Sequence, residues 1–277
     1  MSHKGDFLTL LKSQNCHIQL GTDDLNSGSL PFGAAGDSGT HSLEVAEGTT
    51  VIAVRYQDGI LIAGDRRATA GTSVMYDRAE KVLSIDDYSV LAISGSPAIA
   101  YEVARVLEHS FQYFRRSQLQ ELSVEGKLRM LSRLIRENLP MALQGIGGVI
   151  PILALYDMNH QEDENGGKIY FYDALGAHFE NAAFAVSGSG SVWIRGILRY
   201  LDRWEGGPLA EMDLQKATRT VLRLLDTASE YDVATSGYNP KSRIFPTAKT
   251  ITREGIRDLP EQQLDEIYTE SVDVDYA

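Results

Sequence analysis

The sequence predicts an α+β fold of four layers, an αββα sandwich in which two packed, mainly antiparallel sheets are flanked by helices. The first observation behind this prediction is the order of the hydrophobic patterns: strands, two helices, strands, two helices, strands. The second is that the first strands are apolar on both faces, so their sheet is expected to be covered on both sides. The third is a globular composition, with 277 residues, 43% hydrophobic and 23% charged, and no solenoid repeat.

Two pairs of strands begin the predicted fold, and two helices follow them. Residues 49–65 read TTVIAVRYQDGILIAGD, two apolar runs joined by Gln57-Asp58-Gly59, and an Asp-Gly pair between such runs is typical of a β-hairpin. A second strand pair is predicted at residues 82–85 and 89–93. The helices are indicated by apolar residues that share one helical face, Ile99, Val103, Val106, Leu107 and Phe114 in the first and Val124, Leu128, Leu131, Ile135 and Leu139 in the second.

The second half of the chain repeats this alternation. Strands are predicted near residues 149–156 and 168–173, separated by the polar loop MNHQEDENGG, and a further strand near 182–187. Helical patterns lie near residues 190–204 and 213–230. A strand at 247–252 comes last, and residues from about 260 to 277 are expected to form an acidic, solvated tail.

The charge distribution excludes some classes of partner. The formal net charge is −12, which argues against nucleic acid and against a polybasic membrane surface. No run of about 18 apolar residues is present for a membrane span, and no signal peptide is recognised at the start of the chain. The one cysteine, Cys16, rules out an intrachain disulfide and suits a reducing cytoplasm.

Residues 1–48 are interpreted as a largely irregular propeptide that is removed on maturation. The stretch 21–48 is rich in Gly, Ser, Asp and Thr and has too few apolar residues to order a core, whereas a strand pattern begins sharply at Thr49. A cut between Gly48 and Thr49 would give Thr49 a free α-amine, whose pKa of about 7.7–8.0 makes it a useful base beside the threonine hydroxyl. The alternative is that Thr49 simply opens a strand.

Several other short motifs are weak when taken one at a time. Asp65 lies in Gly-Asp-Arg-Arg-Ala-Thr after the second strand, where a solvated turn is the alternative, and Lys81 precedes a strand, where a surface lysine is the alternative. Gly95 separates a strand from a helix. The run Ser-Gly-Ser-Gly-Ser at 187–191 is not interpreted as a dinucleotide loop, because Trp193 stands where the third glycine belongs. No cofactor and no metal ion are expected.

Together these motifs resemble one family, the β subunits of 20S proteasomes, which are N-terminal nucleophile hydrolases, and most closely the bacterial, actinobacterial-type branch. The resemblance covers residues 49 to about 259. It includes GTTVIAVRY, AGDRRAT, the SGSGS run, YDVATSG and FPTA, and the intervals from Thr49 to Asp65, Lys81 and Gly95 match those of the family without a gap. It implies a sandwich of the N-terminal nucleophile hydrolase type, with residues 49–277 as the protease domain.

The resemblance also implies roles for individual residues. Thr49 would be the nucleophile, Lys81 paired with Asp65 would lower the pKa of the Thr49 hydroxyl and amine, and the Gly95 N–H would stabilise the oxyanion. The shell around the N-terminal amine would comprise Ser189, Asp232 and Thr235.

Substrate contacts follow from the same resemblance. Thr69 would hydrogen-bond the extended substrate backbone. The positions implied for the S1 pocket are uncharged, which predicts a preference for apolar P1 residues: Ala68, Ala79, Leu83, Ile93, Pro97 and Tyr101. Two positions depart from the family's pattern. Thr235 stands where many relatives have Ser, and Pro97 has no N–H to donate to a substrate.

The expected function is that of a threonine endopeptidase subunit, self-processed at Gly48-Thr49, that degrades unfolded proteins inside stacked rings. Its implied partners are proteasome α subunits, other β subunits and a regulatory ATPase ring, and its expected location is the cytoplasm.

Two alternatives stay open. One is a subunit of the simpler hexameric-ring bacterial protease, which typically reads GDGQAT and is shorter. The other is a catalytically silent ring subunit, which usually lacks the threonine, the lysine or the glycine before the threonine.

Overall fold

The computed structural model describes residues 48–70, 73–144, 147–159, 165–181 and 183–275, with side chains described as far as residue 270. Apart from Gly48, the predicted propeptide therefore lies outside the described residues, as do Cys16 and the middle of the polar loop after residue 159. No helix within these ranges is both long enough and apolar enough to cross a membrane.

The first sheet contains the predicted hairpin at its centre. The predicted strands of residues 49–65 are present and pair antiparallel, so that Tyr56 lies opposite Gly59. All but one residue of the first strand and every residue of the second are buried, as expected for a sheet covered on both faces. In spatial order, the sheet comprises β10 (Phe184–Gly188), β1 (Thr50–Tyr56), β2 (Gly59–Gly64), β11 (Thr247–Thr252) and β12 (Gly255–Asp258).

The second sheet is also antiparallel throughout. Its spatial order is β5 (Val82–Asp86), β6 (Ser89–Ala92), β7 (Ile152–Tyr156), β8 (Gly167–Tyr172) and β9 (His178–Asn181). A separate two-stranded ribbon, β3 (Ala68–Ala70) and β4 (Ser73–Tyr76), follows β2. The short strands β3, β4, β9 and β12 were not predicted.

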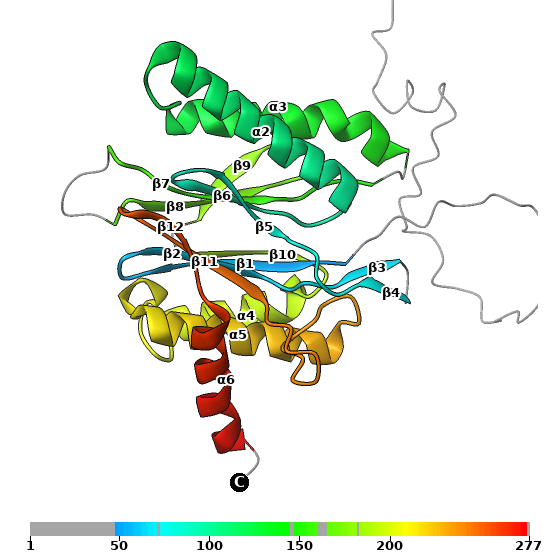
Figure 1. Ribbon diagram of the computed structural model, residues 1–277, viewed down its shortest axis with the longest axis vertical. Helices are drawn as coiled ribbons and strands as arrows, with labels where there is room; N and C mark the ends of the chain where they lie inside the picture. The colour runs from blue at the N-terminus through cyan, green and yellow to red at the C-terminus, as the bar shows by residue number, and fades with distance from the viewer. Residues whose placement is uncertain (1–47, 71–72, 145–146, 160–164, 182, 276–277) are drawn as a thin grey trace, which may run out of the picture. The chain divides into compact units, whose positions relative to one another are not determined.

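Helices cover the outer face of each sheet, which confirms the four-layer αββα sandwich (Figure 1). Helices α2 (Pro97–Gln118) and α3 (Val124–Leu143) pack on the second sheet, and α4 (Ser191–Arg203) and α5 (Leu214–Tyr231) pack on the first. A short 3-10 helix, η1 (Leu209–Glu211), precedes α5. A third apolar cluster fills the space between the sheets, where Val51 and Ile62 of the first sheet meet Val90 and Ile152 of the second.

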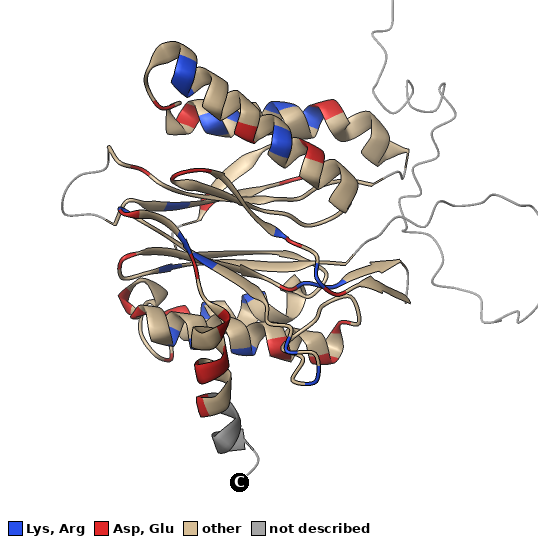
Figure 2. Ribbon diagram, in the orientation of Figure 1, with Lys and Arg blue, Asp and Glu red and all other residues tan. Residues whose placement is uncertain are grey.

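The acidic C-terminal residues differ from the prediction, because they form a helix rather than a solvated tail. Helix α6 (Glu261–Asp275) is rich in acidic residues (Figure 2), and those described are exposed or partly exposed: Glu261, Asp265, Glu266 and Glu270. Its residues Leu264, Ile267 and Tyr268 have the i, i+3, i+4 spacing of one helical face and are buried in the core beside α5. The carboxylates around these three residues obscured the apolar pattern in the sequence.

Asp226 of α5 connects helix α6 to the loop that follows α5. One of its carboxylate oxygens accepts hydrogen bonds from the Tyr238 N–H at 2.8 Å and from the Tyr268 hydroxyl at 3.4 Å. The ring of Tyr238 stacks on those of Tyr268 and Phe245 at 4.5 and 4.7 Å between centroids. Burial raises the pKa of Asp226 to about 6, against the two hydrogen bonds, with Glu230 adding to the rise.

We expect this carboxylate to make stability depend on pH in the direction opposite to a salt-bridged aspartate. Its pKa is higher in the folded protein than the unfolded value of 3.8, so its protonated form favours folding, and this contribution is lost as the pH rises through about 6. Asn at position 226 keeps an acceptor oxygen but cannot ionise. Asp226→Asn should therefore gain stability relative to the wild type between pH 4.5 and 7.5, by about 2 kcal/mol over that range.

The measurement is the unfolding midpoint of both chains at several pH values under the same conditions. Asp265→Asn, which removes a partly exposed carboxylate from α6 that is paired with Arg243, is the control and should show no such gain. An Asp226→Asn chain whose difference from the wild type stays constant with pH would show that this carboxylate does not titrate in that range.

Candidate active site

A buried carboxylate organises the polar residues at the beginning of β1. The Asp65 side chain, directly after β2, is 0% exposed, so it is not the solvated turn considered from the sequence. One of its oxygens accepts the Thr50 N–H at 2.7 Å and the Lys81 ammonium at 2.8 Å. The other accepts the N–H groups of Arg67 at 2.9 Å and Ser236 at 3.1 Å. Four donors thus compensate the cost of burying this charge.

Lys81 lies beside Asp65 and is also buried, with 3% of its surface exposed, so the alternative of a surface lysine is wrong. Its ammonium has three hydrogen-bond acceptors, which are the Asp65 carboxylate, the Arg67 carbonyl and, at 3.0 Å, the Gly48 carbonyl. Burial lowers the pKa of Lys81, while the neighbouring Asp65 carboxylate opposes that shift. The group is a cation held against a peptide carbonyl.

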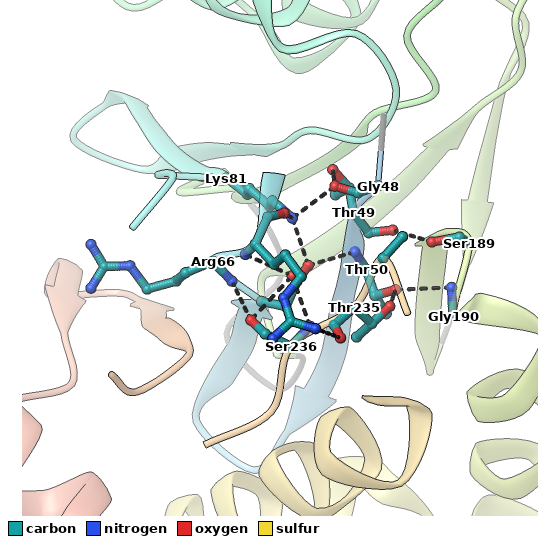
Figure 3. Close-up of polar contacts among 12 residues, drawn as sticks. Gly48, Thr49, Thr50, Arg66, Lys81, Ser189, Gly190, Thr235 and Ser236 are labelled. Carbon is teal, nitrogen blue, oxygen red and sulfur yellow. Dashed lines mark hydrogen bonds and ion pairs between the residues drawn. The ribbon is translucent and has the colours of Figure 1, made fainter. Parts of the chain in front are cut away.

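The peptide bond between Gly48 and Thr49 faces this lysine (Figure 3). The Thr49 hydroxyl donates to the Gly48 carbonyl oxygen at 2.7 Å, so that oxygen accepts hydrogen bonds from both Lys81 and Thr49. Gly48 has φ +126°, and a Cβ at this position would come within 2.5 Å of the Thr69 hydroxyl and 2.7 Å of the Ala234 side chain. The backbone at this bond therefore has room only for glycine.

On the other side of β1, a second polar network joins the three residues expected to surround the amine. Asp232 accepts hydrogen bonds from Ser189 Oγ at 2.6 Å and from Thr235 Oγ1. The Ser189 N–H donates to the Thr49 carbonyl at 3.0 Å, which links this network to the residue that begins the strand. Ser189, Asp232 and Thr235 are therefore brought together beside Thr49.

Thr50 and Ser236 belong to these networks but were not identified from the sequence. Thr50 Oγ1 is fully buried, contacts Thr235 Oγ1 at 2.6 Å and accepts the Gly190 N–H at 2.9 Å. Ser236 donates its N–H to Asp65 from a distant loop. Two sequence features could have pointed to these residues: the second threonine of Gly-Thr-Thr for Thr50, and the Thr-Ser pair at 235–236 for Ser236.

Gly95 lies at the edge of a cavity of about 540 Å³ that is also lined by Gly48, Thr49 and Ser189. Its φ is +99°, and a Cβ would lie 2.0 Å from the Gly148 carbonyl oxygen, so no other residue fits without a shift of the backbone. Gly95 also pairs with Val149 as an isolated bridge next to β7. The backbone of Gly95 is thus exposed to the same space as the Gly48–Thr49 bond.

The positions expected to form the S1 pocket lie on neighbouring segments. The Ala79 N–H bonds the Arg66 carbonyl at 3.0 Å, close to Ala68, and the Tyr101 hydroxyl bonds the Glu80 carbonyl at 2.9 Å. Ile93 and, partly, Leu83 belong to the apolar cluster beneath α2, and Pro97 is the first residue of that helix. Thr69 is buried next to Gly48.

The chemistry available to this arrangement is acyl transfer at a carbonyl. Thr49 and Gly95 line one cavity, and the buried Lys81 ammonium contacts the Gly48 carbonyl beside it. A hydroxyl, an ammonium and a backbone N–H are the kinds of group that can serve acyl transfer as nucleophile, charge partner and oxyanion donor. Within the described ranges, no three His, Cys, Asp or Glu side chains gather as metal ligands would. A threonine at the head of a central strand of an αββα sandwich, beside a buried Lys–Asp pair, defines the class of N-terminal nucleophile hydrolases.

Comparison with known proteins identifies the family within that class. Residues 45–239 match the proteasome subunit family, which is more than half of the chain. The proteasome subunit beta 2 of Thermomonospora curvata is 39% identical over 235 residues, 84% of this chain and 80% of that protein. The proteasome subunit beta of Acidothermus cellulolyticus is 38% identical over 242 residues, 87% and 80% of the two chains.

A third relative gives the same result. The proteasome subunit beta of Streptomyces griseus is 34% identical over 226 residues, which cover 82% of this chain and 76% of that protein. The chain therefore belongs to the proteasome subunit family, among the β subunits, and its enzyme class is threonine-type endopeptidase.

The buried Thr50 hydroxyl leads to a prediction about stability. Thr50→Val keeps the shape of the side chain but leaves the buried Gly190 N–H without an acceptor, so it should cost about 1–3 kcal/mol of unfolding free energy. Thr218→Val is the matched control, because the Thr218 hydroxyl is equally buried yet bonds only the Leu214 carbonyl of its own helix. It should cost less, since that carbonyl keeps its helical hydrogen bond.

Urea unfolding of the three purified chains measures both costs. Equal costs at positions 50 and 218 would mean that the Thr50 hydroxyl adds nothing by linking β1 to Gly190 and Thr235.

Proposed function

We propose that the chain is the precursor of a self-processing threonine endopeptidase that cleaves its own Gly48–Thr49 bond and then degrades unfolded proteins to peptides inside a ring particle. The observation that carries the proposal is the hydrogen bonding of the Gly48 carbonyl oxygen to both the Thr49 hydroxyl and the Lys81 ammonium. A cation on a peptide oxygen polarises that carbonyl and stabilises the negative charge that forms when it is attacked.

In the proposed processing reaction, Thr49 Oγ1 attacks the Gly48 carbonyl carbon. The oxyanion collapses with breakage of the C–N bond, and the hydroxyl proton ends on the Thr49 nitrogen, which becomes a free amine. Water then hydrolyses the resulting ester, restoring the hydroxyl and releasing residues 1–48 with a Gly48 carboxylate. The Lys81 ammonium favours the deprotonated oxygen throughout, because the neighbouring Asp65 carboxylate opposes the lowering of the lysine pKa by burial.

In the proposed peptidase reaction, the same hydroxyl attacks substrates with the new amine as its base. The Ser189–Asp232–Thr235 network is adjacent to the Thr49 backbone and is suited to hold that amine in place. The Gly95 N–H is assigned to the oxyanion, because Gly95 lines the cavity that contains the reacting bond. Thr69 is assigned to the substrate backbone.

Assembly is part of the proposal. The relatives are named as proteasome subunits, which supports stacked rings with α subunits and other β subunits. A regulatory ATPase ring and a cytoplasmic location are inferred along with them. A silent ring subunit is disfavoured because Thr49, Lys81 and Asp65 form one connected cluster. The hexameric-ring protease is disfavoured by the names and lengths of the relatives.

The processing reaction gives the main test. The intact mass of the mature particle should correspond to a chain that begins at Thr49. Lys81→Ala should block leader removal, so that the folded subunit keeps residues 1–48. A Lys81→Ala chain expressed from Thr49 with a free amine isolates the second reaction and should cleave peptides at least about a hundredfold more slowly than the same chain with Lys81.

Two outcomes would contradict this mechanism. One is an active particle whose β subunit begins at a residue other than Thr49. The other is a matured Lys81→Ala particle that cleaves peptides within a few-fold of the wild type. Lys168→Ala, which removes a lysine paired with Asp157 away from this cluster, is a control that should be processed normally.

The uncharged positions near Lys81 predict the preference at P1. Fluorogenic peptides that differ only at P1 should be cleaved best when that residue is apolar or aromatic, because a charged side chain would lose its hydration among Ala79, Leu83 and Ile93 without a partner. The measurement is kcat/KM for each peptide. Higher values for Arg or Glu at P1 would mean that the pocket lies elsewhere.

A further inference from the structure

The cavity that contains Thr49 continues into a second hollow along α4. The two cavities, of about 540 and 680 Å³, share four lining residues: Phe171, Val186, Ser191 and Arg195. The second extends away from the Gly48–Thr49 bond to Phe179, Phe184 and Arg199. Together they form one groove, here called the α4 groove, which begins at the reacting bond.

The order of the strands places this groove on the side of Thr49 opposite to the proposed S1 pocket. In the first sheet, β1 lies between β2 and β10; the S1 positions follow β2, whereas the groove is lined by β10. In the second sheet, the S1 position Leu83 is on the edge strand β5, whereas Phe171 and Phe179 are on β8 and β9 at the other edge. Thr49 therefore lies between the positions assigned to S1 and the α4 groove, as a scissile bond lies between the two sides of a bound peptide.

Charge distinguishes the groove from an ordinary apolar hollow. Its described lining contains Arg195 and Arg199 but no aspartate or glutamate. Among the residues described, no carboxylate pairs with Arg195, whose guanidinium donates to the Val186 carbonyl at 3.3 Å. Arg199 lies over the Phe184 ring, 5.4 Å from its centroid, and forms an ion pair with Asp202 at 3.6 Å along the same helix.

The spacing of the two arginines suits an extended peptide. They are four positions apart on the helix, a rise of about 6 Å, which is close to the repeat of side chains on one face of an extended chain, about 6.6 Å. Two side chains of the same face can thus meet the two guanidinium groups. A guanidinium prefers a carboxylate among protein groups.

We propose that the α4 groove binds the substrate residues C-terminal to the scissile bond and that Arg195 and Arg199 select acidic side chains there. This inference rests on the proposed function and adds a specificity on the leaving side of the same site. The aromatic walls would hold the peptide, and the arginines would favour Asp or Glu over Lys or Arg.

The test uses the mature particle and three internally quenched peptides with an identical sequence up to the scissile bond. They carry Glu, Gln or Lys at the second to fourth positions after it and end in an amide, so that side chains supply the only carboxylates. At low ionic strength, kcat/KM should be at least about fivefold higher for the Glu peptide than for the Lys peptide, the effect of one partly desolvated ion pair. The Gln peptide should lie between them, and 0.5 M salt should reduce the ratio.

Variants of α4 assign the preference to the groove. The double variant Arg195→Gln/Arg199→Gln should bring the Glu-to-Lys ratio close to one. The control Arg203→Gln, which removes an exposed arginine of the same helix that lies against Trp204 and outside the groove, should keep the wild-type ratio. Each ratio is measured within one enzyme, so a change in the amount of active particle does not affect it.

The outcomes separate the two proposals. A short peptide with a coumarin amide in place of the leaving residues reports the proposed function alone, and failure to cleave it would overturn that function. If this peptide is cleaved but the wild type treats the Glu and Lys peptides equally, the inference about the groove is wrong while the function stands. A preference that survives the double variant would also overturn the inference.

Discussion

The buried carboxylate of Asp65 is the constraint on which the site depends. Its side chain is 0% exposed, so the cost of burying the carboxylate has to be met by donors on both of its oxygens. Those donors come from four places: the first residue of β1, the turn after β2, the lysine before β5 and the loop at Ser236. Satisfying one side chain thereby fixes the relative positions of segments up to 171 residues apart in sequence, and Thr49 and Lys81 are placed as a result.

The beginning of β1 is held from its other side as well. The hydroxyls of Thr50, Thr235 and Ser189 and the carboxylate of Asp232 connect β10, the N-terminus of α4 and the loop after α5. Because β1 is paired on both sides, with β10 and β2, in a sheet covered on both faces, its backbone is held in place. The Gly48–Thr49 bond lies between two such networks, so the folded protein fixes its position.

The layers of the fold and its long elements could be predicted from the sequence, because the Asp58-Gly59 turn and the helical faces of α2, α3 and α5 are local patterns. The strands β3, β4, β9 and β12 are only three or four residues long and are partly exposed, so they carry no clear alternation. Helix α6 was missed because carboxylates surround its three core residues. In the site, the intervals from Thr49 to Asp65 and to Lys81 allowed these residues to be predicted. Thr50 and Ser236 were missed because they contact backbone far away in the sequence, which a local sequence pattern does not reveal.

The lack of space for a side chain at Gly48 has an evolutionary consequence. Under the proposed mechanism, the chain recognises its own bond by a backbone turn next to Thr69 and Ala234, and it recognises foreign peptides by side-chain pockets. Processing and substrate recognition thus depend on different residues, so the residues for each can change independently in evolution. Mutations in the pockets that change substrate specificity need not impair processing. A substitution at position 48 would instead block processing, and the enzyme would stay inactive although its substrate pockets were unchanged.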